Sequence, residues 1–227
     1  MTAAAEHGEL SHAVQDYAKA IYVLEERSGG PVSNNALAER LGVTAASASS
    51  MVKRLDGLGL VAHVPYRGVR LTRPGRRLAL EVLRHHRLLE RYLVEELGVP
   101  WDRVHDEAEV LEHVLSEDLE ARIAAKLGHP RHDPHGDPIP TEDGVVDEGE
   151  TRALADLEPG DRATFTRVSD SDPAKLRYLG EQGIAPGMPL EVVGLEPFGG
   201  PVRVRLGGRE HALGQELAAA MRVARAA

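Results

Sequence analysis

The sequence contains no cysteine, and its 227 residues include only one tryptophan and two phenylalanines. The absence of cysteine excludes a disulfide framework, a thiolate metal site and a cysteine nucleophile. The longest stretch without a charged side chain, residues 41–52, is too short to cross a bilayer. The N-terminal sequence MTAAAEHGELSHAVQDY lacks the basic and apolar segments of a signal peptide, so we expect no secretion signal and a cytoplasmic location.

The net charge of −9 conceals three segments with different charge balance. Residues 40–77 carry eight Lys/Arg against one acid, residues 78–150 carry seven against nineteen, and residues 151–227 carry ten of each. A basic stretch within an acidic chain indicates an anionic partner for that stretch. The length also allows two or three small domains, and we expect three: residues 1–74, 75–145 and 146–227.

The basic segment has the pattern of a winged helix. Apolar residues at helical spacing predict a helix over 9–27, and Ser33 and Thr44 are expected to cap two short helices, NNALAERLG and AASASSMVKRLDGLG. Two short helices joined by a glycine-containing turn form a helix-turn-helix unit. Apolar residues alternate at Leu60, Ala62 and Val64, and again after the turn PYRG, which predicts a hairpin.

A winged helix with this charge is expected to bind double-stranded DNA. Small and hydroxylated side chains would let the second helix of the unit lie close in a groove, and basic side chains would contact phosphates. Helix-turn-helix units also mediate protein–protein contacts, but the arginines of the hairpin favour DNA. The expected DNA-binding residues are Thr44, Ala46, Ser47, Ser49, Ser50, Lys53, Arg54, Arg67 and Arg70.

Residues 104–123, VHDEAEVLEHVLSEDLEARI, gather two histidines and seven carboxylates in one predicted helix. Helical spacing would bring four of them to one side, where like charges repel one another. These four are His105, Glu109, Glu112 and His113. His86 and Glu90 share a face of the preceding helix, which begins at Pro74, and antiparallel packing would let the two sets converge. A divalent cation would relieve the repulsion, and a solvated acidic face is the alternative.

Residues 129–150 are rich in Pro, Gly and Asp without periodicity, which predicts an extended linker. Beyond them, short alternating segments separated by the turns APGM and PFGG predict strands. These segments are RATFTRVS, PLEVVGLE, VRVRLGG and EHALG. The predicted fold is therefore mainly α with a β C-terminal part, in which a winged helix-turn-helix and a central helical domain precede a small β-barrel.

The motifs HHRLLERYL, VHDEAEVLEHVLS and HGDPIP follow DYAKAIYVLEE and a winged helix, and in this order they resemble the diphtheria-toxin-repressor family. The resemblance extends to LGEQGIAPGMPLEVV near the C-terminus. It implies a metal-dependent transcriptional repressor of manganese or iron homeostasis, with a central domain that forms a homodimer and an SH3-like barrel. It also implies that the protein is not an enzyme, that it does not bind a membrane, and that it has no small organic substrate. The residues alone leave a metallohydrolase and a metal-independent regulator as alternatives.

The resemblance also implies two metal sites. The family's primary site takes one ligand from the first helix and three from the acidic helix, which correspond here to Asp16, Glu109, Glu112 and His113. The ancillary site corresponds to His86, Glu90 and His105 together with a donor from the barrel. We expect this donor to be Asp172, although Asp170 could take its place. Lys175 occupies the position of a further polar ligand of the family. Lys19 stands where manganese-dependent members have a glutamate, and since an ammonium cannot ligate a cation, we expect no bridged two-metal primary site.

The donors of the primary site predict the metal. Three carboxylates and an imidazole suit Mn²⁺ and tolerate Fe²⁺, whereas the iron-dependent branch of the family has methionine and cysteine in place of Asp16 and Glu109. Zn²⁺, Co²⁺ and Ni²⁺ would also bind in vitro, because affinity rises along the series. The bound ion would fix the first helix and with it the DNA-binding helices, which makes the metal an effector of DNA binding.

Overall fold

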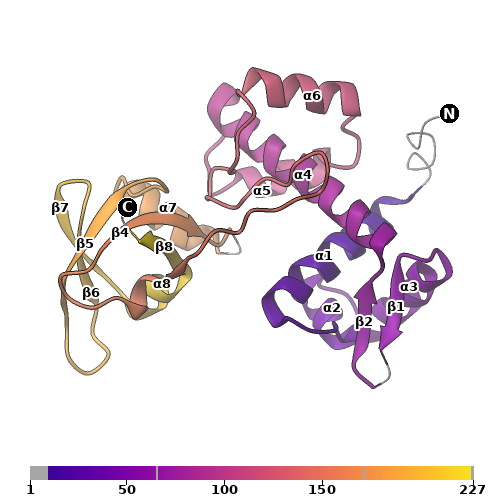
Figure 1. Ribbon diagram of the computed structural model, residues 1–227, viewed down its shortest axis with the longest axis horizontal. Coiled ribbons are helices and arrows are strands. Elements are labelled where there is room, and N and C mark those ends of the chain that lie inside the picture. The colour runs from indigo at the N-terminus through magenta and orange to yellow at the C-terminus, as the bar shows by residue number, and fades with distance from the viewer. Residues whose placement is uncertain (1–9, 65, 171, 226–227) are drawn as a thin grey trace. The chain divides into compact units, whose positions relative to one another are not determined.

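A computed structural model of the chain describes residues 10–64, 66–170 and 172–225 (Figure 1). These residues form two compact units. The first contains the chain up to His85 together with residues 112–114 and 140–145, and the second contains residues 86–111, 115–139 and the chain from Val146 onward. Helix α4 (Arg73–Leu97) contributes to both units. The domain boundaries expected after residues 74 and 145 remain predictions.

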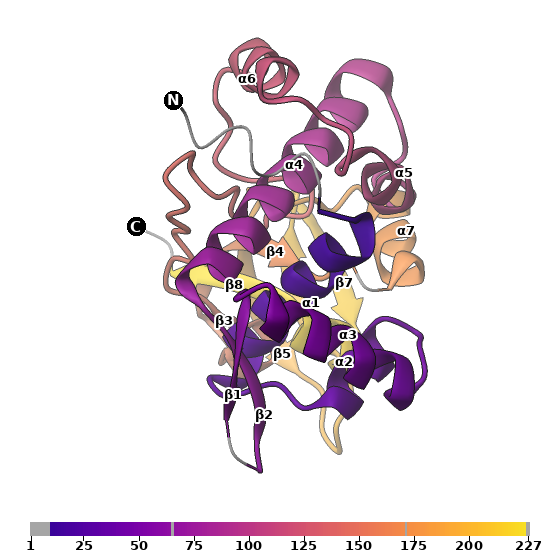
Figure 2. The ribbon, with the colours of Figure 1, turned by 90° about the vertical axis from the view of Figure 1, so that its right-hand side faces the viewer.

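Three helices and a hairpin make up the N-terminal part of the first unit (Figures 1 and 2). They are α1 (His12–Ser28), α2 (Asn34–Arg40), α3 (Ala45–Gly57), β1 (Val61–Val64) and β2 (Gly68–Leu71). The side chains of Ser33 and Thr44 accept hydrogen bonds from the backbone N–H groups of Ala36 and Ser47, as expected of residues that cap α2 and α3. The predicted helix-turn-helix and hairpin are confirmed, although Pro65 of the hairpin turn and Glu9 before α1 lie outside the described residues.

The hairpin differs from its prediction in the face that it buries. Val61 and Val69 are buried, whereas Ala62 is exposed, so the alternation predicted for the first strand is wrong by one residue. The reason is that Leu60 still lies in the turn that ends α3, since its N–H donates to the carbonyl oxygen of Leu55 at 2.9 Å. The strand therefore begins one residue later than the apolar pattern indicates.

Gly68 fixes the hairpin to the helices. Its φ is +114°, and a Cβ at this position would lie 2.0 Å from the carbonyl oxygen of Val32. The close approach lets Val32 and Val69 exchange two backbone hydrogen bonds, of 2.9 and 3.0 Å. The basic hairpin is thereby joined to the segment that precedes α2.

The acidic segment forms two helices in place of the one predicted. These are α5 (Val104–Leu111) and α6 (Glu117–Lys126). Ser116 starts the second helix, because its side chain accepts a hydrogen bond from the N–H of Leu119. Glu112 and His113 consequently lie in the turn after α5 and not on a helix face. The single-helix prediction is wrong, although the helix before it is continuous and carries Pro74 in its first turn as expected.

Residues 129–150 contain no helix or strand, but they are not the extended linker that was predicted. Asp133, His135 and Ile139 are buried. One carboxylate oxygen of Asp133 accepts hydrogen bonds from the backbone N–H groups of His135 and Asp137, at 2.8 and 2.9 Å, and closes a turn. A Cβ on Gly136 would lie 1.8 Å from the carbonyl oxygen of Thr166, so the turn packs directly on a strand of the C-terminal sheet.

The C-terminal part is a six-stranded antiparallel sheet in the order β3-β8-β4-β5-β6-β7 (Figure 1). Its strands are β3 (Arg152–Ala153), β4 (Arg162–Val168), β5 (Pro189–Leu195), β6 (Val202–Leu206), β7 (Arg209–Leu213) and β8 (Met221–Arg225). Two short helices, α7 (Pro173–Glu181) and α8 (Gln215–Ala220), accompany them. Strands β4 to β7 confirm the four predicted strands, whereas β3, β8 and both helices were not predicted. Within the described ranges, no helix is long and apolar enough to span a membrane.

Candidate metal centres and DNA-binding surface

Asp16 of α1 meets Glu112 and His113 of the turn after α5, all within the first unit. Nε2 of His113 lies 2.9 Å from Oδ1 of Asp16 and 3.6 Å from Oε1 of Glu112. The side chain of Glu112 is fully buried and that of His113 is 7% exposed, while Asp16 is reached by solvent. Two carboxylates and an imidazole thus converge, and the structure brings these three predicted residues together. We name them the first cluster.

The ring of His113 is held by two residues of α1. Its Nδ1 lies 2.7 Å from Oε1 of Gln15, and its ring stacks on His12 with centroids 4.6 Å apart. Because the amide oxygen only accepts, Nδ1 donates to it, which leaves Nε2 as the ring atom that faces the two carboxylates and could ligate a metal ion. An outer hydrogen bond that fixes the tautomer in this way is typical of metal-ligating histidines.

Lys19 places an ammonium group beside the first cluster. Its Nζ lies 2.6 Å from Oε1 of Glu112, and its side chain is 12% exposed. A buried carboxylate requires a neutralising partner, and Lys19 supplies part of that charge. The ammonium therefore competes with any metal ion for this carboxylate.

Glu109, the remaining predicted ligand of the primary site, belongs to α5 in the second unit. Its Oε1 lies 3.7 Å from Nε2 of His105, and half of its side chain is exposed. The first cluster consists of the other three residues. The assignment of Glu109 as a fourth ligand stays a prediction.

A second cluster forms where α4 and α5 meet in the second unit. Nε2 of His86 lies 3.1 Å from both Oε1 of Glu90 and Nδ1 of His105, and the latter two atoms are 3.4 Å apart. His86 and Glu90 are four residues apart on α4, so they share a face, and both are buried. The structure brings these three predicted residues together.

The donor from the C-terminal part is Asp170, which replaces the expected Asp172 in this cluster. Oδ2 of Asp170 lies 3.1 Å from Nδ1 of His105. Asp172 instead caps α7, where its Oδ1 accepts hydrogen bonds from the backbone N–H groups of Ala174 and Lys175. It also pairs with the ammonium of Lys175 at 3.4 Å, so its carboxylate is already committed to the start of that helix. His86, Glu90, His105 and Asp170 together are the second cluster.

The charges of the second cluster are strongly coupled. Burial raises the pKa of Glu90, but the surrounding histidines outweigh this effect and hold the pKa well below its ordinary value. Hydrogen bonds to Asp170 and Glu90 raise the pKa of His105 to about 10. Burial likewise raises the pKa of Asp170, but His105 reverses the effect and lowers it. The site thus favours positive charge at its centre, which is now supplied by protonated imidazole.

Both clusters fit a divalent transition-metal ion. They offer carboxylate oxygens and imidazole nitrogens without sulfur, the donor types of manganese, iron and zinc sites. Glu90 and Glu112 are 0% and 1% exposed, so each needs a compensating cation. Metal ions bind such sites by displacing the protons of the imidazoles.

Helix α3 exposes most of the residues expected to contact DNA. Ala48, Val52 and Leu55 are buried on its opposite face. The exposed residues are Thr44, Ala46, Ser47, Ser50, Lys53 and Arg54. Ser49 is half-buried, and its hydroxyl oxygen accepts a hydrogen bond from the side chain of Asn34 at 2.9 Å, so it joins α3 to α2. In the hairpin, Arg67 and Arg70 are exposed.

Three family models match consecutive parts of the chain. The N-terminal DNA-binding domain of iron-dependent repressors matches residues 9–69, and their metal-binding and dimerisation domain matches residues 72–141. The FeoA domain matches residues 152–225. The first matched segment contains the helix-turn-helix and Asp16, the second contains the other residues of both clusters except Asp170, and the third contains Asp170 and the C-terminal sheet.

Curated relatives and solved structures give the same result. The iron-dependent repressor IdeR of Mycobacterium tuberculosis is 40% identical over 163 residues, which cover 71% of this chain and 67% of that protein. The diphtheria toxin repressor of Corynebacterium jeikeium is 34% identical over 73% of this chain and 70% of that protein. The chain belongs to the diphtheria-toxin-repressor family. A manganese-dependent transcriptional repressor in complex with manganese is 47% identical and superposes with a TM-score of 0.86 over 94% of this chain and all of that one.

Membership in the diphtheria-toxin-repressor family decides between the alternatives left by the sequence. The chain is a metal-dependent transcriptional repressor with a DNA-binding domain, a metal-binding and dimerisation domain and an SH3-like C-terminal part. The family consists of DNA-binding repressors and not of enzymes, so the metallohydrolase and the metal-independent regulator are both excluded.

Sequence reasoning missed two buried residues next to the second cluster, Asp133 and His135. Both lie in HPRHDPHGDPIP, a segment without periodicity that gives no indication of its position in the fold. The available signal was chemical, because the segment places a histidine among aspartates, and in the structure this histidine, His135, is fully buried. Periodicity predicts helices and strands, but it does not predict such a turn.

Replacing Arg67 or Arg70 by alanine is expected to weaken DNA binding to a similar extent for all DNA sequences. An exposed arginine of the hairpin contacts phosphates, so each loss should reduce the slope of log K against log salt by roughly one. Binding isotherms at several salt concentrations measure this slope, with manganese affinity as the control that should not change. A variant with the parent's affinity and salt slope would show that the hairpin does not contact DNA.

Proposed function

We propose that this repressor responds to Mn²⁺, with Fe²⁺ as a second effector, and that the ion binds Asp16, Glu112 and His113, with Glu109 as the fourth ligand. The observation that carries the proposal is the 2.9 Å distance between Nε2 of His113 and Asp16 on α1, next to the buried Glu112. The second cluster provides the ancillary site, with Asp170 as its donor from the C-terminal part. The protein acts in the cytoplasm.

The donor set supports Mn²⁺ as the effector. Hard carboxylate oxygens with a single imidazole suit Mn²⁺ and tolerate Fe²⁺, and no sulfur is present to favour later metals. The similar repressor of 47% identity is manganese-dependent, whereas the relatives of 40% identity are iron-dependent. Lys19, 2.6 Å from Glu112, favours one ion over a bridged pair at the primary site.

The ion links metal binding to DNA binding through α1. Asp16 lies on this helix, whose buried residues Val14, Ala18 and Ile21 belong to the core of the first unit. Without the ion, side-chain contacts hold the helix to the turn at 112–113, among them that of Lys19 with Glu112. With it, the ligands are joined, which favours the conformation of α2 and α3 that binds DNA.

The protein binds operator DNA as a homodimer. Val110 on α5 and Leu119 on α6 are exposed apolar residues of the central helices, 71% and 49% accessible, and they suit an interface with a second copy. A two-fold dimer places two recognition helices at two half-sites of the operator.

A gel shift with DNA from upstream of its own gene tests the proposed function. We expect a shifted band with Mn²⁺, none with EDTA, and recovery when Mn²⁺ is added in excess of the chelator. Mg²⁺ at the same concentration serves as the control, because it is bound poorly by imidazole. Equal binding with Mn²⁺ and with EDTA would refute the proposal.

The identity of the ligands should set the order of metal activation. The double variant Asp16→Met, Glu109→Cys introduces a thioether and a thiolate, which prefer softer ions. We expect Mn²⁺ to activate this variant less effectively relative to Fe²⁺ and Co²⁺ than it activates the parent. Metal titrations of DNA binding under anaerobic conditions measure the order. An unchanged order would show that these two positions do not determine selectivity.

A further inference from the structure

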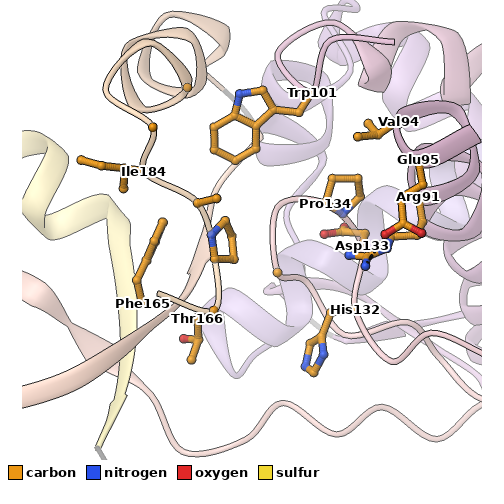
Figure 3. A pocket seen from close by; sticks show the side chains of 16 residues that line it. Arg91, Val94, Glu95, Trp101, His132, Asp133, Pro134, Phe165, Thr166 and Ile184 are labelled. Carbon is orange, nitrogen blue, oxygen red and sulfur yellow. Dashed lines mark ion pairs between the residues drawn. The ribbon is translucent and has the colours of Figure 1, made fainter. Parts of the chain in front are cut away.

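Tyr66 lies in the turn between β1 and β2, and its side chain is fully exposed. Other aromatic side chains are packed inside the protein. Tyr22 is 3% exposed and Phe165 is 0% exposed, and Figure 3 shows Phe165 and Trp101 on the walls of a cavity in the second unit. A single exposed ring is ordinary on a protein surface, so exposure alone assigns no role to Tyr66.

The backbone of Tyr66 makes this residue unusual. Its φ is +61°, in the left-handed region, where a bulky side chain is an outlier. The N–H of Arg67 donates to the carbonyl oxygen of Val64 at 3.0 Å, so Tyr66 is the third residue of a four-residue turn. A positive φ at this position favours Gly or Asn. Tyrosine here strains the backbone without any gain from burial, and such strain is typical of residues kept for function.

The surroundings of Tyr66 indicate DNA as its partner. Residues 61–71, VAHVPYRGVRL, include the exposed Arg67 and Arg70 and no acidic residue. The hairpin follows α3 directly, and Figures 1 and 2 show it extending away from α1, α2 and α3. A strand of four residues is about 13 Å long, and the major groove is about 12 Å wide. When α3 lies in the major groove, the end of the hairpin therefore reaches across a phosphate strand to the neighbouring minor groove.

We propose that Tyr66 enters this minor groove and favours A·T base pairs there. A groove about 6 Å wide admits a flat ring. At an A·T pair its floor presents only acceptors, N3 of adenine and O2 of thymine, to which the phenol hydroxyl donates. At a G·C pair the amino group of guanine projects from the floor and obstructs the ring. Tyr66 thus adds a sequence preference to a hairpin whose arginines contact phosphates, which carry no sequence information.

The hairpin holds the ring in position before DNA binds. Gly68, two residues after Tyr66, lies so close to Val32 that a Cβ would be 2.0 Å from the carbonyl oxygen of Val32. Val32 also exchanges backbone hydrogen bonds of 2.9 and 3.0 Å with Val69. An anchored turn loses little conformational freedom on binding, so the contact of the ring contributes more fully to affinity.

Phe198 shares the exposure and backbone of Tyr66 but not its charged surroundings. It is fully exposed, its φ is +60°, and it lies between β5 and β6 of the C-terminal sheet. The nearby guanidinium of Arg203 pairs with Glu196 at 3.5 Å and with Glu210 at 3.9 Å, so acidic side chains offset its charge. Phe198 is therefore a matched control for substitutions of Tyr66.

Three versions of the DNA from upstream of the gene test the inference with the full-length protein in saturating Mn²⁺. Footprinting locates the half-sites, and the base pairs beside them are made A·T, G·C or inosine·cytosine. Inosine·cytosine presents the major groove of G·C but lacks the amino group in the minor groove. We expect the parent to bind the A·T and inosine·cytosine versions equally and the G·C version about tenfold more weakly.

Tyr66→Gly should bind all three versions alike, and as weakly as the parent binds the G·C version. Glycine suits the positive φ, so this variant should unfold at no lower temperature than the parent. Tyr66→Phe keeps the ring without the donor and should retain a preference of about threefold, as expected for loss of one hydrogen bond. Phe198→Gly should behave as the parent does.

The inference is overturned if Tyr66→Gly or Tyr66→Phe keeps the full preference of the parent, or if the parent binds the inosine·cytosine version as weakly as the G·C version. It rests on the proposed function only for the choice of Mn²⁺ as the activating ion. If the parent binds DNA with Fe²⁺ or Zn²⁺ but not with Mn²⁺, that choice fails, whereas the three versions are compared in the same way with the active ion.

Discussion

Asp16→Ala is expected to abolish manganese-activated DNA binding while the protein remains folded. The carboxylate lies 2.9 Å from Nε2 of His113 and is the one ligand of the first cluster that belongs to the DNA-binding domain. Without it, an ion bound at Glu112 and His113 no longer holds α1, and metal ceases to act as an effector. Fluorescence anisotropy with labelled operator DNA should show at least a hundredfold loss of affinity in saturating Mn²⁺, equivalent to about 2.7 kcal/mol.

Two further variants serve as controls for Asp16→Ala: one removes a carboxylate elsewhere in the same unit, and the other removes the histidine that faces Asp16. Glu39→Ala removes one exposed carboxylate from α2 of the same unit and should retain activation by Mn²⁺. His113→Ala should lose activation as Asp16→Ala does, and the double variant should be no worse than either single one, because one lost ligand already uncouples α1 from the metal. Additive losses, or activation of Asp16→Ala equal to that of the parent, would contradict the metal link through α1.

Lys19→Met is expected to have opposite effects on the metal-free and metal-bound protein. The substitution removes the ammonium that lies 2.6 Å from the buried Oε1 of Glu112. Loss of one partner of a buried ion pair costs about 3 kcal/mol, so the metal-free variant should unfold at a lower temperature than the parent. The competing cation is also gone, so Mn²⁺ should bind at least tenfold more tightly and should raise the melting temperature by more than in the parent.

Thermal unfolding with and without Mn²⁺ measures both effects of Lys19→Met, and calorimetry gives the manganese affinity. Lys126→Met is the matched control, because Lys126 pairs with Glu96 at 3.0 Å but is 60% exposed. An exposed pair contributes little, so this control should change the free energy of unfolding by less than about 1 kcal/mol and leave metal affinity unchanged. If Lys19→Met behaves like the control, the ammonium does not compete with metal.

The N-terminal part was predictable because its signals are local. Ser33 and Thr44 are residue types that cap helices, so they predict the starts of α2 and α3, and each side chain accepts the expected backbone hydrogen bond. Strands β4 to β7 follow from alternation between turns in the same way. Helical spacing indicated the histidines and glutamates of both metal clusters, whereas Asp16 and the donor from the C-terminal part came from the resemblance of motifs to a known family, since spacing along a helix alone does not show that Asp16 lies beside His113.

The errors arose where distant contacts or a cap override periodicity. Apolar spacing continues through Ser116, but the serine hydroxyl caps a new helix and leaves Glu112 and His113 in a turn. The sequence does not show which of Asp170 and Asp172 lies in the second cluster. The structure shows that Asp172 caps the start of α7, which leaves Asp170 for the cluster. The position of His135 depends on the close approach of Gly136 to the backbone of Thr166, which no local pattern indicates.

The dissociation constant of Mn²⁺, measured with and without saturating operator DNA, tests the central claim most directly. Binding free energies are reciprocal, so if Mn²⁺ strengthens DNA binding by a given factor, DNA must strengthen Mn²⁺ binding by the same factor. For the parent we expect matching factors of at least tenfold, and for Asp16→Ala a factor of one. If the affinity of the parent for Mn²⁺ is the same with and without DNA, then metal bound at Asp16, Glu112 and His113 is not what controls the repressor.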